Sequence, residues 1–491
     1  MSTDLAIILS FLLPTVAGLS TALTGRWPNA RDSLTVLWGV LTFGTVLTLL
    51  PVVNAGGRPG LVLWEVLEGL PIAFEVEPLG MLFALVASGL WIVTSVYAFG
   101  YMRGHHEENQ TRFFSYFPLA ITAALGIAYA RNLFTLFLFY EMLTFSTYPL
   151  VTHHQNATAQ RAGRIYLGIL VSTSVLFLFT AIVWTYAIAG TTEFTVGGVL
   201  AGKASGWPVA VLAGLYFFGI GKAALMPFHR WLPNAMVAPT PVSALLHAVA
   251  VVKAGVFSVL KIVIYIFGID FLAAGSYSEW LMWVAGFTLL SSSVVALKQD
   301  NLKARLAYST ISQLAYIVLA AAIATGDSVV GGGMHIAMHA MAKITLFFAA
   351  GAIMVATHKT EISDMDGIGR TMPITMTAFF IASLSIMGLP PTGGAWSKWY
   401  LALGAAETGQ YLFVAVYMIS SLLSIAYLGP IIGRAFFRPP RADSHHPLPE
   451  GMKEAHWLMV VPLSLTAIGT VVLFFFANNV HDLLAPIAIG G

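Results

Sequence analysis

The sequence contains no cysteine and little charge. Without cysteine the chain cannot hold an iron–sulfur cluster through thiolates, attach a c-type haem or form a disulfide, so any redox chemistry must belong to a partner. Only 9% of the 491 residues are charged, whereas 58% are hydrophobic. A soluble protein carries roughly 25% charged residues, so this composition predicts an integral membrane protein. No basic run is present that would follow phosphates, which excludes nucleic acid as a partner.

The hydrophobic residues are grouped into long runs. Windows of about 20 apolar residues predict one all-α membrane domain, residues 1–491, with fourteen spanning helices. The first run has no basic n-region and no small-residue cleavage site, so we expect a retained helix rather than a signal peptide. The stretch 57–77 alternates and carries four acids, which predicts an extramembrane hairpin. The expected helices are 4–23, 34–53, 78–102, 114–130, 133–151, 166–189, 207–229, 243–267, 279–297, 305–325, 330–356, 374–406, 411–436 and 457–478.

Basic residues are distributed unevenly between the loops of this predicted bundle. Most of the 24 lysines and arginines lie in loops after odd-numbered helices, whereas Arg58, Arg131 and Lys203 follow even-numbered ones. By the positive-inside rule the odd-numbered loops face the cytoplasm. We therefore expect a multi-pass protein of the cell membrane with both termini on its outer face.

Helices four to eight, residues 114–267, and helices nine to thirteen, residues 279–436, form two sets of five. An odd number of spans reverses orientation, so we expect two inverted five-helix repeats. The fourth helix of each set carries a lysine near proline, namely Lys222 and Lys398. Proline removes a backbone hydrogen bond, so both helices are expected to be broken, as is tolerated at membrane depth where the backbone is buried or lines a cavity. The residues expected to form the breaks are Pro227, Pro390, Pro391, Gly393 and Gly394.

Charged side chains inside the predicted spans are the main candidates for function, because they are costly there and mark proton or ion pathways. Glu141 is the one acid of 22 that lies well inside a span. We interpret it as a proton-binding carboxylate whose proton affinity changes when a lysine approaches, and Lys222 as that lysine. The alternative is a buried acid satisfied by a neighbouring helix. The lysines inside predicted spans are Lys222, Lys253, Lys261, Lys343 and Lys398.

Lys253 lies in the middle of a span, with Gly255 beside it to admit close packing or water. His247 precedes Lys253 by six residues, which is not the same helical face, so we expect it to reach a water chain rather than Lys253. A single buried histidine is also often a packed core residue. Lys398 is expected to end the proton relay on the side opposite Glu141.

Three side chains recur at every fourth position of one helix: His335, His339 and Lys343. This spacing places them on one stripe, and histidine titrates near neutral pH, so the stripe predicts a proton relay. Histidines four residues apart are also a metal-ligand spacing, but no Cys, Asp or Glu lies nearby as a third ligand, so we expect no metal. Water in the channel is expected at Ser309, Ser312 and Gln313.

Several charges near predicted helix ends have less specific interpretations. Lys261 is expected to extend to the outer surface by snorkelling. His229 is either a proton inlet at the cytoplasmic end or an ordinary interfacial residue. Asp300, Lys303 and Arg305 are interpreted as structural loop charges.

These residues together resemble the antiporter-like membrane subunits of respiratory complex I and of the Mrp-type multisubunit cation/proton antiporters. The lysine in helix 12 is similar to that of the Mrp D subunit. The resemblance covers residues 78 to 436. Its motifs are Glu141, Lys222 with Pro227, His229, Trp231-Leu232-Pro233, Ala238-Pro239, Pro241-Val242-Ser243-Ala244, His247, Lys253, the stretch from Leu306 to Gln313, the histidine stripe, and Gly388-Leu389-Pro390-Pro391.

The resemblance implies a charge pair of Glu141 and Lys222. It implies a hydrated axis that continues through Lys253 and through Lys343 with His339, and that ends at Lys398. It further implies a proton-translocating subunit of a monovalent cation (Na⁺)/H⁺ antiporter, with other membrane subunits, protons, a cation and the lipid bilayer as partners. No cofactor is expected.

Two other functions stay open from the sequence. A proton-pumping subunit of a complex I-like or hydrogenase-type redox complex would use the same axis, driven by electron transfer elsewhere, and would make the chain part of an enzyme. A scaffold subunit would transport nothing, but buried charges are costly to keep without use.

Overall fold

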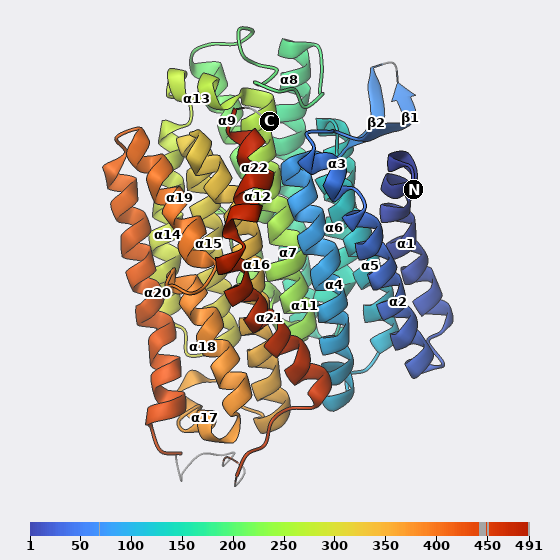
Figure 1. The fold of residues 1–491 in the computed structure, drawn as a ribbon, viewed down its shortest axis with the longest axis vertical. Coiled ribbons are helices and arrows are strands. Elements are labelled where there is room, and N and C mark those ends of the chain that lie inside the picture. The colour runs from blue at the N-terminus through green and yellow to red at the C-terminus, as the bar shows by residue number, and fades with distance from the viewer. Residues whose placement is uncertain (68, 441–447, 449–450, 490–491) are drawn as a thin grey trace.

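The computed structural model describes residues 1–67, 69–440, 448 and 451–489. Within these residues the chain is a bundle of helices that run along its long axis (Figure 1). Twelve of the described helices are long and apolar enough to cross a membrane, and α9 (Trp207–Gly219) and α18 (Pro373–Met387) are shorter apolar helices. These correspond one by one to the fourteen predicted spans. The expected all-α membrane architecture is confirmed.

Several spans combine more than one helical segment. The first half of the bundle contains α1 (Thr3–Leu23), α2 (Pro28–Leu47) with α3 (Leu50–Asn54), α4 (Pro78–Gly104), α5 (Gln110–Ala128), α6 (Leu133–Val151), α7 (Ala157–Thr173) with a π-helical segment η1 (Ser174–Phe179) and α8 (Thr180–Ala189), α9, a 3₁₀ turn η2 (Gly221–Ala223), α10 (Trp231–Asn234) and a second turn η3 (Ala235–Val237).

The second half begins with a span that contains two further π-helical segments. Its helices are α11 (Thr240–Ala244), η4 (Leu245–Val249), α12 (Val251–Ile262) and η5 (Val263–Phe267), then α13 (Ile269–Gly275), α14 (Glu279–Lys298), α15 (Leu302–Ile323), α16 (Gly326–Thr357), η6 (Ile362–Asp364), α17 (Ile368–Thr371), α18, α19 (Gly394–Glu407), α20 (Tyr411–Phe437), α21 (Trp457–Phe475), α22 (Ala477–Leu484) and η7 (Ala485–Ile489).

The predicted hairpin is confirmed. Strands β1 (Gly60–Leu67) and β2 (Leu70–Glu75) pair antiparallel, with Gly60 opposite Glu75, and project at the upper end of the bundle (Figure 1). The hairpin leads into Glu77, whose carboxylate accepts the backbone N–H groups of Leu79 and Gly80 and caps α4. A carboxylate at a helix N-terminus satisfies otherwise unpaired N–H groups.

The core of the bundle is formed by three spans. The segment Thr240–Phe267 is covered along its whole length by other helices, and α15 and α16 are mostly buried. The outer spans α1, α20 and α21 are largely exposed on their apolar faces, as expected of helices that contact lipid. Most of the candidate residues lie on the central spans and not on the periphery.

Both predicted helix breaks are present, so residues 207–229 and 374–406 are not continuous helices. The helix α9 ends at Gly219, and an irregular segment with a cis Met226–Pro227 bond follows. The helix α18 ends at Gly388, in the left-handed region at φ +84°, and α19 begins only at Gly394.

Some helix boundaries differ from those expected. The span that starts with α7 begins at Ala157 rather than at 166, because the Asn156 side chain accepts the N–H of Ala159 and caps a polar first turn that a hydropathy window misses. The helices α22 and η7 lie mostly beyond the last predicted span. The two inverted repeats stay a prediction.

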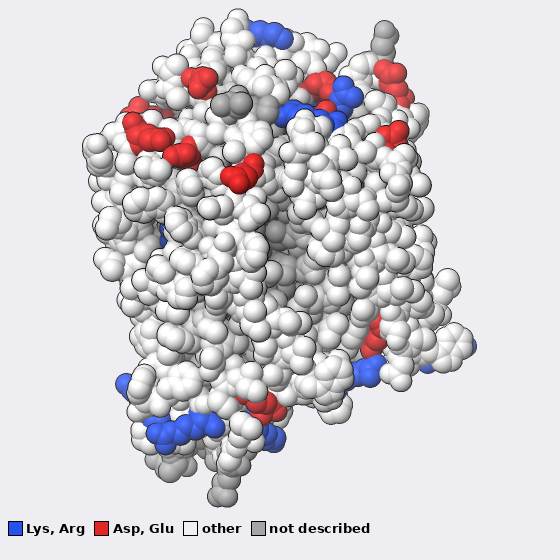
Figure 2. Space-filling model, in the orientation of Figure 1, with Lys and Arg blue, Asp and Glu red and all other residues white. Residues whose placement is uncertain are grey.

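Charge divides the two ends of the molecule. On the face shown in Figure 2, Lys and Arg gather at the lower end, whereas Asp and Glu predominate at the upper end. A broad band between them carries almost no charge, as expected where lipid tails would lie. The start of α1 and the C-terminal helix α22 both lie in the upper half (Figure 1).

Candidate functional site

The centre of the candidate site is a contact between Lys253 on α12 and His339 on α16. The ammonium of Lys253 and Nδ1 of His339 are hydrogen-bonded, and both side chains are buried. The other ring nitrogen of His339, Nε2, is buried and has no protein partner. A buried nitrogen without a protein partner is normally hydrogen-bonded to water. We therefore expect Nε2 of His339 to bind a water molecule.

His335 extends the site from α16 to two further helices. Its ring is stacked on that of His339, with centroids 5.7 Å apart and an angle of 15° between the planes. Nδ1 is 2.9 Å from Ser397 Oγ on α19, and Nε2 is 3.2 Å from Gln313 Oε1 on α15. Every histidine of the predicted stripe therefore has a polar contact across a helix interface.

Lys398 lies near the start of α19, just after the second helix break, at the far end of this row. Its Nζ donates to the carbonyl of Ile386 at 2.6 Å and to Ser421 Oγ at 3.0 Å. Ile386 is near the end of α18, where the break leaves carbonyl groups without helical partners. The Tyr316 ring lies between the two ends of the row: it is stacked on His335, and its hydroxyl is 3.5 Å from Lys398 Nζ.

Lys343 forms a side branch of the row. Its Nζ donates to Ser309 Oγ at 2.7 Å and to the carbonyl of Leu306 at 3.3 Å. Ser309 in turn is 2.9 Å from the Tyr427 hydroxyl on α20. Ser312 bonds Ser293 and Ser420 instead, at 2.8 and 3.2 Å, so it supports the packing of α14, α15 and α20 and does not contact a lysine directly.

Lys222 lies in the first helix break and points towards α6. Its Nζ donates to the carbonyl of Tyr140 at 2.9 Å and to Thr144 Oγ1 at 2.5 Å, and it lies 3.3 Å from the centre of the Tyr140 ring. The Tyr140 hydroxyl accepts the backbone N–H of Lys222 at 3.1 Å. This tyrosine, which sequence reasoning did not single out, therefore holds the lysine by both its side chain and its backbone.

Glu141 is the next residue of α6, but the predicted charge pair is not closed. Among the described residues no ion pair joins Glu141 to Lys222, although the two lie in electrostatic range of each other. Glu141 is half-buried, and its Oε1 is a buried atom without a hydrogen-bond partner. The structure thus brings the two residues to neighbouring positions without joining them.

Gly255 connects the first break to the central row. A Cβ at this position would lie 2.4 Å from the Lys222 carbonyl carbon and 2.4 Å from Ala223 N, which no side chain tolerates. The backbone of α12 therefore packs directly on the backbone of the break, two residues from Lys253. The expected close packing at Gly255 is confirmed.

The remaining predicted histidines lie beside the row. Both ring nitrogens of His247 are buried without a protein partner, and its ring packs on Phe347 at 4.6 Å. It lies in the electrostatic range of Lys253 and Lys343. His229 is farther away, near the end of the first break, and its Nδ1 is also buried and unpaired.

Lys261 corrects the sequence-based expectation. It does not extend to the surface: its side chain is 1% exposed and forms an ion pair with Glu77 at 3.3 Å. The Tyr265 hydroxyl donates to the same carboxylate at 3.2 Å. Glu77 is therefore a buried acid that the sequence analysis did not single out, although its position directly before Pro78 at a helix start is a signal for it.

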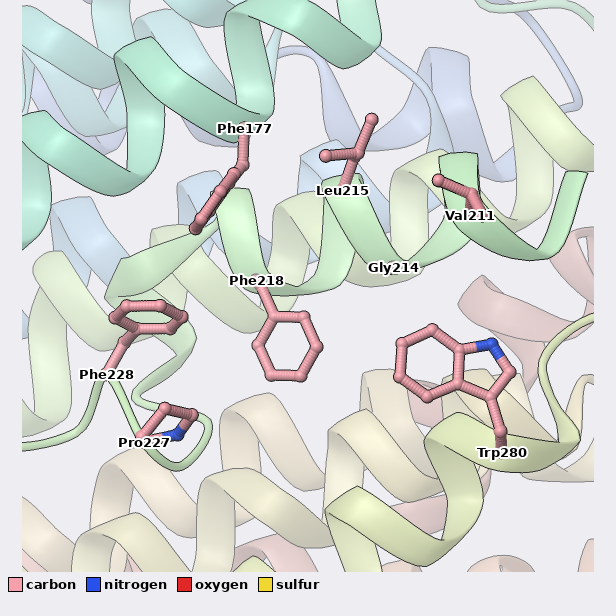
Figure 3. A pocket seen from close by; sticks show the side chains of 8 residues that line it. All are labelled: Phe177, Val211, Gly214, Leu215, Phe218, Pro227, Phe228 and Trp280. Atoms are coloured by element: carbon pink, nitrogen blue, oxygen red, sulfur yellow. The ribbon is translucent and has the colours of Figure 1, made fainter. Parts of the chain in front are cut away.

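An apolar groove of about 280 Å³ lies beside the first break. Figure 3 shows its wall, made by side chains of η1, α9, the break and α14, with the Trp280 ring at one end and Phe228 with Pro227 at the other. None of the described charged residues of the row lines it. The polar row is thus separated from this apolar face.

The comparisons with known proteins agree on one family. The family model described as NADH:quinone oxidoreductase/Mrp antiporter, TM matches residues 130–424, and the model of the N-terminus of chain 5 of NADH-ubiquinone oxidoreductase (complex I) matches residues 68–114. NADH-quinone oxidoreductase subunit N of Desulforudis audaxviator (strain MP104C) is 35% identical over 423 residues, 83% of each chain.

A second relative comes from the antiporters. The A/B subunit of a probable K⁺/H⁺ antiporter of Rhizobium meliloti (strain 1021) is 31% identical over 418 residues, 83% of this chain, and the match spans only 40% of that longer protein. Among solved structures, a chain of the Mrp complex from Dietzia sp. DQ12-45-1b superposes with a TM-score of 0.87 at 20% identity, covering 99% of this chain and 97% of that one. The fold is therefore shared with the Mrp complex.

Proposed function

Since this chain belongs to the NADH:quinone oxidoreductase/Mrp antiporter family, we propose that it moves protons along its buried polar row as one membrane subunit of a larger complex. One observation carries the proposal: the row passes from Lys253 through His339, His335 and Tyr316 to Lys398 by successive contacts. Basic groups buried in a membrane bundle at this cost are retained where charge moves.

The first step takes place at the open pair. Lys222 bonds to Thr144 and the Tyr140 carbonyl, and its movement from these acceptors towards Glu141 changes the affinity of Glu141 for a proton. The Gly255 contact ties the break that carries Lys222 to α12, so a shift of the break is transmitted to the segment that carries Lys253.

The second step takes place along the row. A proton that reaches the Lys253 and His339 pair passes by way of bridging water to His335. Gln313 and Ser397 orient the His335 ring, and the proton continues by water past Tyr316, whose hydroxyl contacts Lys398. Histidine suits this role because it accepts a proton on one nitrogen and releases it from the other. Lys343 with Ser309 stores charge beside the row.

Within this proposal the chain serves a monovalent cation/proton antiporter, with Na⁺ as the counter-ion and other membrane subunits as partners. The resemblance to the K⁺/H⁺ antiporter protein supports exchange of a monovalent cation for protons. The basic lower end faces the cytoplasm, and both termini face the outer side of the cell membrane, by the positive-inside rule.

A proton-pumping subunit of a redox complex is the second candidate, and one observation favours it. The relative with 35% identity is a subunit of an NADH-quinone oxidoreductase, and the chain covers 83% of its length. Here electron transfer in other subunits would drive the same row.

Gentle purification from the native membrane tests the choice. Recovery of small membrane-embedded subunits without cofactors supports the antiporter, whereas copurified iron–sulfur, flavin or nickel subunits support the redox pump and overturn the antiporter.

Transport by the whole complex in inside-out vesicles tests the row itself. Lys253→Ala is expected to lower the initial rate of proton movement by roughly a hundredfold, the typical contribution of a positioned proton-transfer group. Lys203→Ala, at an exposed lysine that bonds only the Ala189 carbonyl, is the matched control. Equal rates for the two variants in assembled complexes would leave a scaffold function as the remaining explanation.

A further inference from the structure

A group of histidines surrounds one carboxylate at the lower end of the bundle, where α4 ends and α5 begins. Oε1 of Glu107 is 2.8 Å from His105 Nδ1, and Oε2 is 3.5 Å from His154 Nδ1 and 3.8 Å from His153 Nε2. The Glu107 side chain is 5% exposed although it lies in a loop. None of these residues belongs to the polar row, and we call them the Glu107 cluster.

His153 is the member that is hardest to explain as a packed residue. Its side chain is 2% exposed, and neither ring nitrogen has a hydrogen-bond partner. Burial lowers the pKa of His153 from 6.5 to about 4, with Glu107 acting in the opposite direction and Arg112 and His154 in the same one. The imidazole is therefore neutral at pH 7, and its two unpaired nitrogens can bind water.

The geometry of the cluster does not fit a metal ion. Within the described residues, no group of three or more His, Asp or Glu side chains converges with a geometry that would hold a metal. The distances from Glu107 to His153 and His154 are those of ion pairs and not of ligands on a common centre.

Other charged groups face the cluster from the helices around it. Arg112 on α5 donates to the carbonyl of His153. Lys303 on α15 lies in the electrostatic range of Glu107 and donates to the Ala238 carbonyl at 2.7 Å. Tyr101 on α4 also lies in electrostatic range of Glu107. Its side chain contacts Thr240, the first residue of α11. The cluster therefore borders the start of the central span.

A stripe of unpaired polar atoms leads from there towards the row. Thr240, Ser243 and His247 follow at intervals of three and four residues, so they share one face of the helix. All three are fully buried. The Ser243 hydroxyl and both ring nitrogens of His247 have no protein partner among the described residues, and Thr240 lies against Tyr101. A buried polar group left without a partner is costly, so we infer that water molecules bind along this stripe.

We propose that the Glu107 cluster collects protons at the lower end of the bundle and passes them along Thr240, Ser243 and His247 to Lys253 and Lys343. This inference rests on the proposed function, because it supplies protons to the same row. It assigns the inlet to a cluster that the site residues predicted from the sequence do not include. Lys303, interpreted from the sequence as a structural loop charge, lies between the cluster and His247 in electrostatic range of both.

The test measures initial rates of proton translocation by the whole complex in inside-out vesicles at about pH 6.5, near the usual histidine pKa, and at about pH 8.5, above the usual histidine range. Glu107→Gln and His153→Gln are expected to slow transport by roughly threefold or more at the higher pH, where protons are scarce, and by less at the lower pH. His106→Gln is the matched control, because His106 is an exposed neighbour outside the ion pairs of the described residues with Glu107.

Two further variants separate the outcomes. If Glu107→Gln does not assemble, His154→Gln replaces a partly exposed member of the cluster and is held to the same expectation. Rates equal to those of His106→Gln at both pH values overturn the inference. Lys253→Ala in the same experiment separates this outcome from failure of the proposed function. If Lys253→Ala abolishes transport, only the inlet proposal falls. If Lys253→Ala still transports protons normally, the proposed function falls as well.

Discussion

The ammonium of Lys222 lies 2.5 Å from the hydroxyl of Thr144, one helical turn along α6 from the carboxylate predicted to be its ion-pair partner. Two uncharged acceptors on α6 therefore hold a lysine beside an unpaired Glu141 oxygen. This arrangement is one of two states that the proposed charge pair requires. It also fixes which contacts must break before the pair can close.

Thr144→Val is expected to shift Lys222 towards Glu141. The change keeps the shape of the side chain but removes a hydrogen bond to a charged group, worth about 1.5–3 kcal/mol. A structure of the variant complex would measure the distance between Lys222 Nζ and the Glu141 carboxylate. Thr147→Val is the control, because its hydroxyl bonds Tyr166 instead. An unmoved Lys222 would contradict the two-state interpretation.

Tyr316→Phe is expected to slow proton transport by roughly tenfold while the complex still assembles. The change removes the hydroxyl that contacts Lys398 and Ser421 and leaves the ring stacked on His335, and a positioned proton-transfer group contributes at least about that factor. Transport in vesicles measures the effect. Tyr216→Phe, whose hydroxyl bonds Thr185 outside the row, should transport normally.

Gly255→Ala is expected to destabilise the chain by about 1–3 kcal/mol or more, because an added methyl group overpacks a filled interface and here meets backbone atoms at 2.4 Å. Thermal unfolding of the purified complex measures the change. The matched control is Gly433→Ala, where a Cβ meets nothing within 4 Å. Equal melting temperatures for the two variants would contradict the prediction. They would show that the backbone of the first helix break moves away from α12 to make room for the added methyl group.

Loss of the ion pair between Glu77 and Lys261 is expected to destabilise the protein most when one of the two charges stays buried without its partner. Lys261→Met alone leaves a buried carboxylate without its cation, at a cost of about 3–5 kcal/mol. Adding Glu77→Gln to Lys261→Met removes that charge and should restore part of the loss, while the amide oxygen still caps α4. Unfolding of the two single variants and the double variant gives the coupling energy, and additive losses would argue against a direct pair.

Acidification is expected to destabilise the lower end of the bundle through His153. The pKa of His153 is about 4 in the folded protein because of burial, against 6.5 when unfolded, so the unfolded state binds the proton more tightly. The contribution to stability is complete above pH 6.5 and is lost as the pH falls towards 4. His153→Gln cannot titrate, so its unfolding free energy should depend less on pH across this window. Parallel pH profiles for the variant and the parent would oppose this prediction.

The sequence was sufficient to place the charged residues of the row. Lys253, Lys343 and Lys398 each stand alone in an apolar stretch, where the cost of burial makes a charge conspicuous. The helical period then predicted the shared stripe of His335 and His339, and the structure confirms it. Proline and glycine in the sequence also indicated both helix breaks, because these residues disturb a helical backbone.

The uncharged contacts were beyond sequence reasoning. Tyr140, Tyr316 and Ser421 are ordinary residues of apolar helices, and only the rotation of each helix brings their hydroxyls to a lysine. Lys261 was misjudged because its partner, Glu77, lies far away in the chain and reaches it through the fold. Local patterns carry no information about such distant pairs.

Other helices of the same chain enclose the segment Thr240–Phe267 along its whole length. This enclosure bears on how one kind of subunit can occur in different complexes. The helices that enclose this segment all belong to the same chain, so the row proposed to carry protons needs no neighbouring subunit to cover this segment. The packing around the buried residues of such a chain does not depend on which subunits bind to its outside. The same interior is therefore compatible with an ion-exchanging assembly and with an electron-transferring one. Relatives from both kinds of assembly are what such modularity would produce.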